Sequence, residues 1–351
     1  MDKLKVAIVG ATGIAGQQFV SALAGHPWFE VAALASSERS AGKTYLGALS
    51  KDGGTQWFAD GEIPEQMREA VLVDSAALDA AKFDVIFTAV GSEAARALEP
   101  KYAKTTPVIS TASAFRYEAD VPLMIPGINL EHAELLEVQK KNRGFGGFVA
   151  PIPNCTTTGL AVSLAPLKKF GISSVVMVSM QAVSGAGRSP GVLALDITDN
   201  VIPFIDGEEE KVCRETQKIL GQYSNGSITP LDAQVNASCN RVNVREGHTE
   251  CVFASFESKP QETEIIEEWE NFDPCLQVPS KPDRFIMYNR NPYRPQPRLD
   301  RDNGDGMATT LGRLRKSGTY YQWTIVSHNT KIGAAKGAIL LCECLKKNGH
   351  F

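Results

Sequence analysis

The sequence lacks the features that mark membrane, nucleic-acid-binding and zinc-binding proteins. No apolar run approaches the length needed to span a bilayer, so we expect no membrane partner. No excess of basic residues is present: the formal net charge of −4 argues against a nucleic-acid partner, which usually demands a basic face. The seven cysteines are scattered, and the one close pair, Cys342 and Cys344, lacks the spacing of a zinc site. We therefore expect reduced thiols and no metal.

Targeting signals, internal repeats and low-complexity tracts are also missing. The N-terminal residues Met-Asp-Lys-Leu-Lys-Val lead directly into a strand-like run, so we expect no signal peptide. Reduced thiols then fit a cytoplasmic protein. With 351 residues, of which 43% are hydrophobic and 22% charged, the chain has the composition of a soluble globular protein and is too long for one ordinary core. Two domains are expected.

A glycine-rich turn near the N-terminus predicts a dinucleotide site. The strand-like run 5–9 leads into Gly10-Ala-Thr-Gly13-Ile-Ala-Gly16 and then into a helical pattern over 17–24. Gly10 allows a tight turn, Gly13 lets the backbone approach a pyrophosphate, and Gly16 lets helix and strand pack closely. The phosphates would lie at the helix N-terminus. The spacing differs from the common Gly-x-Gly-x-x-Gly fingerprint, and a plain strand-to-helix turn is the alternative.

The residues after the second expected strand, 31–35, favour NADP over NAD. They are Ser36, Ser37, Glu38, Arg39 and Ser40. An NAD site usually places an acidic residue here to bind the ribose 2′-hydroxyl, whereas three hydroxyls and an arginine suit a 2′-phosphate. Glu38 argues in the other direction, and an exposed polar loop is the alternative interpretation.

Strands and helices alternate through the first part of the chain. Further strands are expected at 71–73, 84–90 and 107–111, with helical patterns such as 92–103 between them. This alternation predicts an α/β domain of Rossmann type, with a doubly wound parallel sheet. Arg116 follows the last of these strands, at the sheet edge where ligands bind, and can hold an anion bidentately. A solvated surface arginine is the alternative.

Cys155 has the sequence context of a nucleophile. It lies between a strand-like run, 147–152, and a helical pattern, 156–170. A cysteine at a helix N-terminus meets unpaired N–H groups and the positive end of the helix dipole, which favour the thiolate. A thiolate in this position can attack a carbonyl group. A buried structural cysteine is the alternative, and it is the commoner fate of a lone cysteine.

The rest of the chain offers partners for such a cysteine. A β-rich run over 173–182 ends in a glycine loop that allows a ligand to approach the backbone. His248 follows Gly247 at the edge of a strand and is a candidate general base. A cysteine and a histidine far apart in sequence can meet in space, although spacing alone does not pair these two. Asn329 is expected to cap a last helix over 330–346.

Six short motifs occur along the chain in one order. They are Gly-Ala-Thr-Gly (10–13), Pro-Asn-Cys-Thr-Thr (153–157), Gln-Ala-Val-Ser-Gly-Ala-Gly (181–187), Gly-Glu-Glu-x-Lys (207–211), Arg-x-x-x-x-x-Gly-His (241–248) and Ser-His-Asn-Thr (327–330). This series, which covers nearly the whole chain, resembles the aspartate-β-semialdehyde dehydrogenases, more in their archaeal and fungal branch than in the common bacterial one. The resemblance implies the design of glyceraldehyde-3-phosphate dehydrogenase. An NADP-binding domain would comprise 1–150 plus 330–351, and an α+β catalytic and dimerisation domain would comprise 151–329.

The resemblance also implies a role for each matching residue. Cys155 would attack the acyl carbonyl and form a thioester, Gln181 would orient the acyl group, and His248 would be the acid/base. The implied substrate ligands are Arg241 for the α-carboxylate, Glu208 for the α-amino group, and Arg116, Asn154 and Lys211 for phosphate. Glu209 and Glu210 adjoin Glu208, which leaves the register of the amino-group ligand open. The implied cofactor ligands are Thr12, Gly13, Ile14 and Ala15 at the pyrophosphate, and Ser184, Gly185 and Asn329 at the nicotinamide.

The reaction implied is NADPH-dependent reduction of L-aspartyl-4-phosphate to L-aspartate-4-semialdehyde with release of phosphate, in the biosynthesis of lysine, threonine, methionine and isoleucine. Reduction of an acyl phosphate needs a nucleophile that holds the acyl group while hydride arrives, a group that manages the proton, and donors for the oxyanion. A CoA-thioester reductase such as malonyl-CoA reductase and a catalytically silent NADP-binding regulator are the alternatives. The family precedent and the irregular segment 281–305 suggest a homodimer or homotetramer.

Overall fold

The computed structural model describes residues 2–51, 53–188 and 191–351, which form two compact units. The first comprises Met1–Pro122, Ala133–Ile152 and Ala338–Phe351, and the second comprises Leu123–His132 and Pro153–Gly337. The expected domains differ from these units at residues 123–132 and at the start of the C-terminal segment. Residues 123–132 belong with the second unit because Gly127 packs against Pro274 and the His132 ring bonds the backbone of Gly221.

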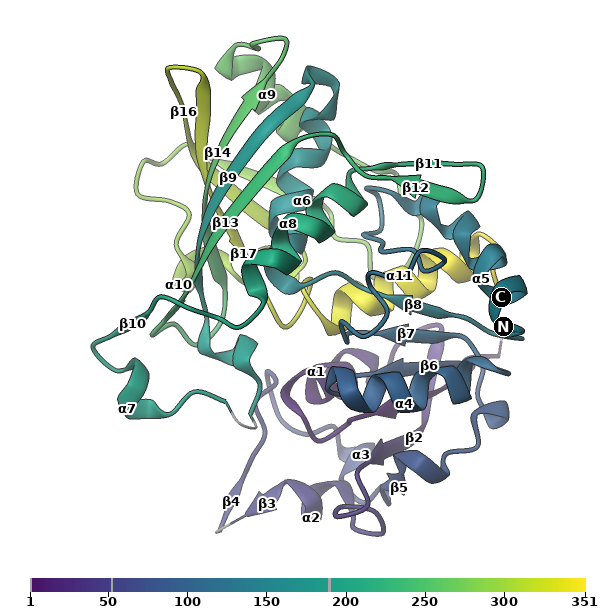
Figure 1. The fold of residues 1–351 in the computed structure, drawn as a ribbon. Coiled ribbons are helices and arrows are strands. Elements are labelled where there is room, and N and C mark those ends of the chain that lie inside the picture. The colour runs from purple at the N-terminus through teal and green to yellow at the C-terminus, as the bar shows by residue number, and fades with distance from the viewer. Residues whose placement is uncertain (1, 52, 189–190) are drawn as a thin grey trace. The chain divides into compact units, whose positions relative to one another are not determined.

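The first unit is built on a parallel sheet of six strands, in the order β5-β2-β1-β6-β7-β8 (Figure 1). Every pair of neighbours in this sheet is parallel. The strands are β1 (Leu4–Val9), β2 (Phe29–Ser36), β5 (Val73–Asp74), β6 (Val85–Thr88), β7 (Val108–Ser110) and β8 (Val149–Pro151). The central strands are buried on both faces, as in doubly wound folds. The predicted α/β class of this part is confirmed.

The helices of the first unit follow its strands in the chain. The longer ones are α1 (Ile14–Leu23), α4 (Ser92–Ala103), α5 (Leu135–Arg143) and α11 (Ala335–Lys347), and the short ones are α2 (Tyr45–Leu49) and α3 (Glu65–Arg68). A small hairpin is formed by β3 (Ser50–Lys51) and β4 (Gly54–Thr55). The C-terminal helix is anchored within this unit by the buried pair His26 and Glu343, whose Nε2 and Oε1 atoms are 2.8 Å apart.

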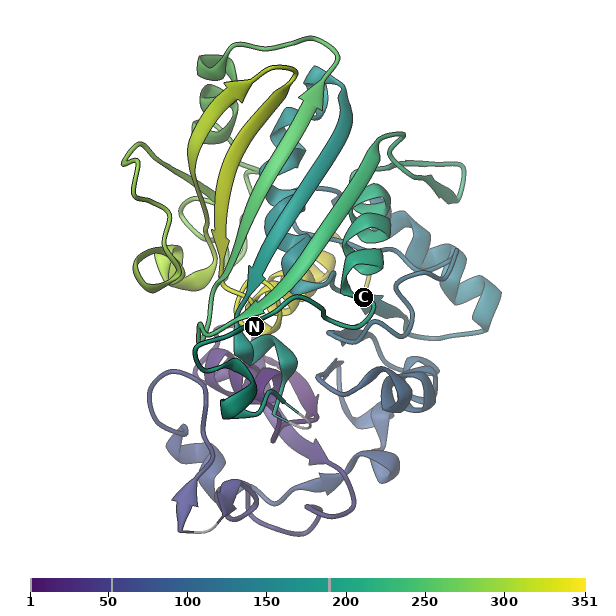
Figure 2. The same cartoon turned by 60° about the vertical axis from the view of Figure 1, so that its left-hand side comes forward.

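The second unit contains a mixed sheet of seven strands, in the order β10-β13-β9-β14-β17-β16-β15. Figure 2 shows this sheet broadly face-on. The strands are β9 (Ile172–Gln181), β10 (Val201–Ile202), β13 (Gln234–Val242), β14 (His248–Phe256), β15 (Ile286–Asn289), β16 (Thr309–Ser317) and β17 (Tyr320–Ser327). Strand β13 runs parallel to β9, whereas β14 runs antiparallel to both β9 and β17. The predicted α+β class is confirmed.

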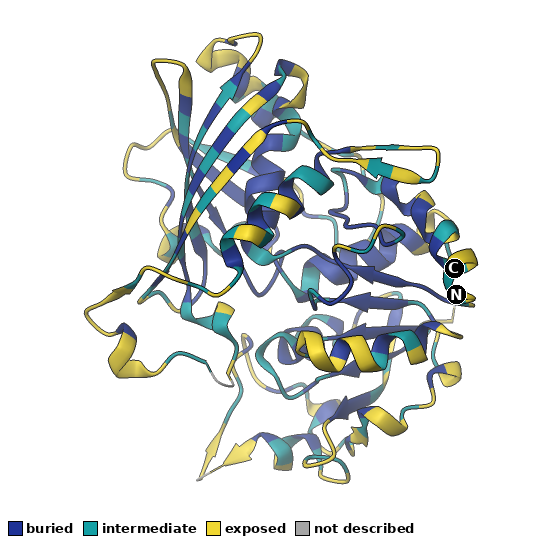
Figure 3. Ribbon diagram, in the orientation of Figure 1, coloured by how far each residue is buried: buried dark blue, intermediate teal, exposed yellow. Residues whose placement is uncertain are grey.

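Helices pack on one face of this mixed sheet. They are α6 (Cys155–Leu164), α8 (Glu208–Ile219) and α9 (Glu262–Glu270); the short helices α7 (Ala194–Ile197) and α10 (Pro297–Asp300) and the hairpin β11 (Gln222–Ser224) and β12 (Ser227–Thr229) lie in the connections. Alternate residues along β9 and β14 are buried (Figure 3), which is the pattern of a sheet covered on one face. Trp269 of α9 donates to the carbonyl of Ser163 in α6 and packs against Trp323 of β17, so the helices and the sheet share one core.

Several details differ from expectation, and three of them bear on the site. The helix expected over 156–170 ends at Leu164 and continues as the 3₁₀ helix η4 (Ala165–Phe170), since Pro166 has no N–H to donate. Helix α11 begins at Ala335, not at residue 330, so Asn329 is not its cap. The segment 281–305 contains β15 and α10 and is not irregular throughout. Within the described ranges, no helix is long and apolar enough to cross a membrane.

Candidate active site

Cys155 is the first residue of helix α6, and Asn154 is its N-cap. The Asn154 Oδ1 atom accepts hydrogen bonds from the backbone N–H groups of Thr156, at 2.9 Å, and Thr157, at 3.2 Å. An asparagine at this position satisfies donors that have no partner inside the helix. The thiol therefore lies at the positive end of a well-capped helix, where a thiolate is favoured.

The Cys155 thiol meets the His248 imidazole in the second unit. Sγ and Nε2 are 3.2 Å apart, and the other ring nitrogen, Nδ1, accepts a hydrogen bond from the Ala182 N–H at 3.1 Å. A neutral imidazole whose Nδ1 accepts carries its proton on Nε2, so an N–H group points at the sulfur. Full burial, with Arg241 and His328 nearby, lowers the pKa of His248 to about 3. The ring is therefore neutral around pH 7.

Strand pairing brings the predicted catalytic residues to one edge of the mixed sheet. Arg241 on β13 is in register with Gln181 on β9, and the neighbouring Met180 is paired with Thr249, which follows His248 on β14. The carboxyl ends of two parallel strands thus meet the amino end of an antiparallel one. Gln181 is buried and donates from Nε2 to the Ser179 hydroxyl at 3.2 Å.

Arg241 is a buried cation beside the thiol. Its guanidinium donates to the Ala182 carbonyl at 2.8 Å. Burial lowers the pKa of Arg241, and the neighbouring Cys155 and Glu208 act in the opposite direction. A Cβ atom at Gly185 would lie 3.0 Å from the Arg241 guanidinium and 3.1 Å from the His248 ring. The glycine therefore lets the loop after β9 pass over both side chains.

Asn329 links the two loops that flank His248. Its Oδ1 accepts from the Gly247 N–H at 2.9 Å, and its Nδ2 donates to the Ser184 hydroxyl at 2.8 Å. These bonds explain why Asn329 does not cap α11. Four residues later, Gly333 is close enough to Cys155 that an added Cβ would be 2.8 Å from the Cys155 Cβ.

The acidic cluster at the start of α8 has three different environments. Glu208 is buried, and its Oε1 accepts from Asn154 Nδ2 at 2.9 Å, while its Oε2 lies 3.8 Å from Lys211 Nζ. Glu209 accepts from the backbone N–H of Cys239, and Glu210 is exposed. Of the three glutamates whose register the sequence left open, Glu208 is the one that contacts Asn154.

The glycine-rich turn that we expect to bind a dinucleotide lies between β1 and α1 in the first unit. Gly10 has a positive φ of 84°, and a Cβ at Gly16 would lie only 2.1 Å from the Gly10 carbonyl oxygen, so helix and strand approach closely there. A Cβ at Gly13 would meet only that same oxygen, at 3.5 Å, so chain packing alone does not require a glycine. Thr12, Ile14 and Ala15 are partly exposed, and no side chain caps α1. The turn can accept a pyrophosphate on its N–H groups.

The residues after β2 form an exposed turn. Ser37, Glu38 and Arg39 are exposed, Ser40 is half-buried, and the Ser40 N–H donates to the Ser37 carbonyl. The Ser36 side chain is buried, and its carbonyl accepts from the Ser75 hydroxyl. Of the expected 2′-phosphate ligands, Arg39 and Ser37 are the most accessible.

Arg116, also in the first unit, is buried after β7 and donates to the Thr111 carbonyl at 2.8 Å. Its charge acts on buried Glu99, whose Oε1 accepts from the hydroxyls of Thr88 and Ser110 at the ends of β6 and β7. Burial raises the pKa of Glu99, and these hydroxyls and Arg116 act against that rise. Arg116 is thus a fixed cation, not a solvated surface arginine.

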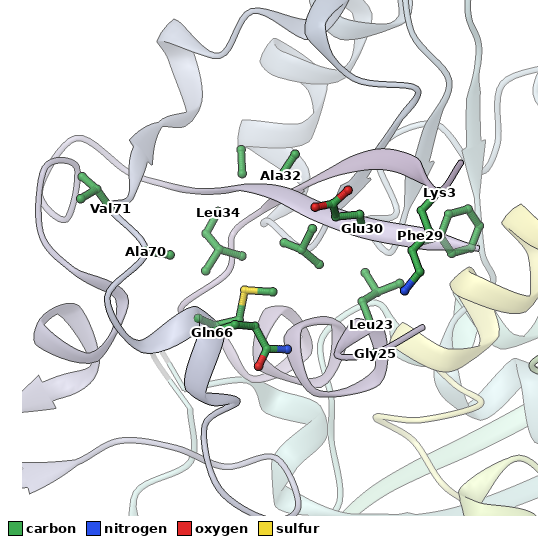
Figure 4. A pocket seen from close by; sticks show the side chains of 13 residues that line it. Lys3, Leu23, Gly25, Phe29, Glu30, Ala32, Leu34, Gln66, Ala70 and Val71 are labelled. Carbon is green, nitrogen blue, oxygen red and sulfur yellow. The ribbon is translucent and has the colours of Figure 1, made fainter. Parts of the chain in front are cut away.

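A separate pocket in the first unit lies along β2. It is lined by Leu23, Phe29, Leu34, Met67 and Val71, among others (Figure 4). None of the residues expected to bind nucleotide or substrate lines it. Among the described residues, no group of three histidine, cysteine, aspartate or glutamate side chains is placed to hold a metal ion.

Sequence reasoning missed the contacts made through backbone groups and through distant side chains. The Ala182 N–H that holds His248 has no side-chain signal, and neither does the close approach of Gly333. The Glu215 carboxylate of α8 accepts from the Asn154 N–H at 2.7 Å. This residue does have a sequence signal, because it is a glutamate on the buried stripe of an amphipathic helix.

Two family models match the chain. The semialdehyde dehydrogenase NAD-binding domain matches residues 5–136, and the semialdehyde dehydrogenase dimerisation domain matches residues 164–332. Both matches lie in regions that contain motifs of the predicted family.

Relatives align with nearly the whole chain. Aspartate-semialdehyde dehydrogenase of Archaeoglobus fulgidus is 46% identical and the enzyme of Methanothermobacter thermautotrophicus 40% identical, with at least 98% of each chain covered. The crystal structure of the Candida albicans aspartate semialdehyde dehydrogenase with NADP superposes with a TM-score of 0.89 at 36% identity, over 99% of this chain and 100% of that one. These matches confirm the resemblance in the motifs: the chain belongs to the aspartate-semialdehyde dehydrogenase family.

Proposed function

We propose that this chain catalyses the NADPH-dependent reduction of L-aspartyl-4-phosphate to L-aspartate-4-semialdehyde and phosphate, a step in the biosynthesis of lysine, threonine, methionine and isoleucine. The observation that carries the proposal is the 3.2 Å contact between Cys155 Sγ and His248 Nε2 at the capped start of α6. Family membership and the activity for which the relatives are named support the substrate. The similar Candida albicans enzyme was crystallised with NADP, which supports the cofactor.

Cys155 is the nucleophile in this proposal. Its thiolate attacks the acyl carbonyl, phosphate leaves, and a thioester to Sγ remains. The Cys155 N–H lies in the first turn of α6, where no intrahelical acceptor exists, and is a candidate donor to the oxyanion. Gln181, one residue before the loop that holds His248, orients the acyl group.

His248 acts through the proton that its neutral ring carries on Nε2. In its neutral form it presents Nε2–H to the thiolate and to the oxygen of the thiohemiacetal, because Nδ1 is occupied by the Ala182 N–H. The expected acid/base role therefore takes the form of a hydrogen-bond donor to developing negative charge. When the thiohemiacetal oxyanion collapses, its oxygen lone pair forms the aldehyde C=O bond, the C–S bond breaks, and the electron pair of that bond leaves on sulfur as the thiolate.

Fixed charges recognise a zwitterionic, phosphorylated substrate. Buried Arg241 holds the α-carboxylate, and Glu208 holds the α-amino group. Arg116, Lys211 and Asn154 bind phosphate. Asn154 Nδ2 and Glu208 Oε1 bond each other in this structure, so substrate binding would exchange that contact for contacts with the ligand.

The residues of the first unit fit a nicotinamide dinucleotide. The Gly10–Gly16 turn and the uncapped N-terminus of α1 suit the pyrophosphate, and exposed Arg39 suits a 2′-phosphate. The bound cofactor would supply hydride to the thioester carbon. Ser184, Gly185 and Asn329, which are joined to one another and to the His248 strand, would contact the nicotinamide.

The first unit would be the NADP-binding domain and the second the catalytic and dimerisation domain of a cytoplasmic homo-oligomer. The description of the matched second family model supports self-association. So does the outward face of the mixed sheet, where Val176, Val178, Met180 and Phe253 are half-exposed. A dimer or a tetramer is proposed.

The decisive assay is phosphate-dependent oxidation of L-aspartate-4-semialdehyde with NADP, followed as NADPH absorbance. We expect turnover that depends on phosphate. Cys155→Ser should reduce kcat at least about 1,000-fold, since nucleophile removal costs on that order, while NADP binding stays unchanged. Absence of turnover by the wild-type enzyme at any usable concentration would refute the proposal.

Two alternatives are separated by the same assay. The relatives named above support neither a CoA-thioester reductase nor a catalytically silent regulator. Activity with malonyl-CoA and none with the semialdehyde would indicate the reductase. A protein that binds NADP but forms no acyl adduct on Cys155 by mass spectrometry would be the regulator.

A further inference from the structure

Two positions on the buried face of α8 carry carboxylates where apolar side chains would be expected. The buried stripe includes Glu208, Val212, Glu215 and Ile219, with the spacing of a helix face turned toward a core. Glu215 is fully buried. A carboxylate in such a place is costly unless strong hydrogen bonds compensate it. Its contacts therefore indicate its role.

Both carboxylates bind the residue that precedes the nucleophile. Glu215 Oε2 accepts from the backbone N–H of Asn154 at 2.7 Å, and Glu208 Oε1 accepts from the Asn154 side chain at 2.9 Å. The remaining side-chain atom of Asn154, Oδ1, caps α6. Helix α8 therefore fixes both the backbone N–H and the side-chain Nδ2 of Asn154.

The hydrogen bond to Glu215 satisfies the N-cap N–H of α6, which a side chain of the same helix usually satisfies. In a capping box, the side chain of the third helical residue accepts a hydrogen bond from the N–H of the N-cap residue. The third residue of α6 is Thr157, whose buried Oγ1 has no hydrogen-bond partner among the described residues. Glu215 supplies the missing acceptor from a second helix, 61 positions away in the chain.

We propose that Glu215 is a positioning residue for Cys155, which completes the cap of α6 from α8 and raises the pH at which the Cys155 thiol ionises. A negative charge next to the N-cap opposes formation of a second negative charge on the sulfur. This inference relies on the proposed function only in treating Cys155 as the reactive thiol.

Other described residues place charges and polar groups around the thiol. Arg241 on β13 favours the thiolate, and the His248 Nε2–H on β14 points at Sγ. Glu208 on α8 opposes the thiolate and is partly offset by Lys211, 3.8 Å away. The segment 329–333 contributes the uncharged backbone of Gly333 at its closest approach. None of these groups is altered when Glu215 becomes glutamine, which keeps an acceptor oxygen and loses the charge.

The test compares Glu215→Gln with Glu210→Gln, which removes the same charge from an exposed position on the same helix. Iodoacetamide alkylation of Cys155 is followed by peptide mass spectrometry across pH. We expect the alkylation midpoint of Glu215→Gln to fall by about one pH unit, which makes the reaction roughly tenfold faster below the midpoint. Glu210→Gln should match the wild type.

A third variant removes the acceptor itself. Glu215→Met should lower kcat at least about tenfold with an unchanged KM for NADP, because displacement of a reacting group by 1 Å can cost on the order of 100-fold. Wild-type alkylation profiles for Glu215→Gln together with a wild-type kcat for Glu215→Met would overturn the inference. If the profile shifts while the wild-type enzyme fails to oxidise the semialdehyde, the positioning role stands and the proposed function fails.

Discussion

His248 is a fully buried imidazole whose surroundings keep it neutral. Burial, followed by the positive charge of Arg241 and by His328, lowers its pKa to about 3. In the unfolded chain the same group has a pKa near about 6.5. The unfolded state therefore binds a proton below that pH, and the folded state does not until about pH 3.

This difference makes the folded protein sensitive to acid. As the pH falls from 6.5 toward 3, the stability associated with a neutral His248 is progressively lost, by about 1.4 kcal/mol per pH unit. Between pH 7.5 and pH 5.0, the free energy of unfolding should fall by about 2 kcal/mol more in the wild type than in His248→Asn. The asparagine Oδ1 of that variant can still accept the hydrogen bond from the Ala182 N–H. Urea unfolding midpoints at the two pH values measure this. If the free energy of unfolding falls equally in the two proteins, the pKa of His248 does not differ between the folded and unfolded states.

The sequence allowed Cys155 and His248 to be predicted as reactive residues, but not their geometry. Motif order identified both side chains. The tautomer of His248 is set by the Ala182 N–H, a backbone group that every residue except proline possesses, so no side-chain pattern marks it. The burial of Glu208 and the exposure of Glu210 were likewise undetermined, because adjacent glutamates in a first helical turn look equivalent in sequence.

The turn between β1 and α1 contains Gly13, and Gly16 follows in α1; the two glycines have different surroundings. A Cβ at Gly16 would overlap the Gly10 carbonyl, at 2.1 Å, whereas a Cβ at Gly13 would have only an ordinary contact, at 3.5 Å. Gly13 also has an unstrained φ of −77°. Packing within the chain therefore requires a glycine at position 16, whereas only a bound ligand would require one at position 13.

Alanine substitutions should separate these two requirements. Gly16→Ala should lower the melting temperature by several degrees, since about 1 kcal/mol or more is lost when a core is overpacked. Gly13→Ala should melt like the wild type but bind NADP at least about tenfold more weakly, because the methyl group occupies the approach of the pyrophosphate. Differential scanning calorimetry and NADP titration measure the two effects. If Gly13→Ala binds NADP normally, the pyrophosphate does not lie on this turn.

The ends of helices and strands were predictable where the local sequence contains a signal that ends them. Helix α4 occupies the predicted residues 92–103, and β1 and β9 lie within one residue of expectation. The start of α11 was predicted five residues early, because Asn329 has the composition of a cap but makes its bonds to Gly247 and Ser184. The contacts of Asn329 with Gly247 and Ser184 set that boundary, and the sequence around residue 329 does not indicate them.

We propose that the outward face of the mixed sheet is the surface used for self-association. Val178 lies on β9, and its partners across the neighbouring strands are Ser238 and Cys251. Val176, Met180 and Phe253 are on the same face, and all four apolar side chains are half-exposed. A charge at the centre of such a patch would be buried without a partner in a dimer.

Val178→Lys should therefore convert the oligomer to a monomer. Light scattering after size-exclusion chromatography gives the mass, to be compared with the 37.9 kDa of one chain. Lys316→Glu, at an exposed position near the end of β16, is the charge-change control and should keep the wild-type mass. A Val178→Lys protein with the wild-type oligomeric mass would place the interface elsewhere.

The division of the whole chain was only partly predictable. The alternation of strands and helices indicated the α/β part, and the motif series indicated the α+β part. That residues 123–132 leave the first unit for the second depends on contacts with Gly221 and Pro274, about 90 and 150 positions later. Such contacts are visible only once the chain is folded.

The cap shared between α6 and α8 has a consequence for protein synthesis. The groups that surround Cys155 are contributed, in order of translation, by residues 154, 208, 215, 241, 248 and 333 of a 351-residue chain. Arg241 and His248, which favour the thiolate, are both made more than 80 positions after Cys155. We therefore expect a nascent polypeptide that ends before residue 241 to carry a less reactive Cys155 thiol than the folded protein.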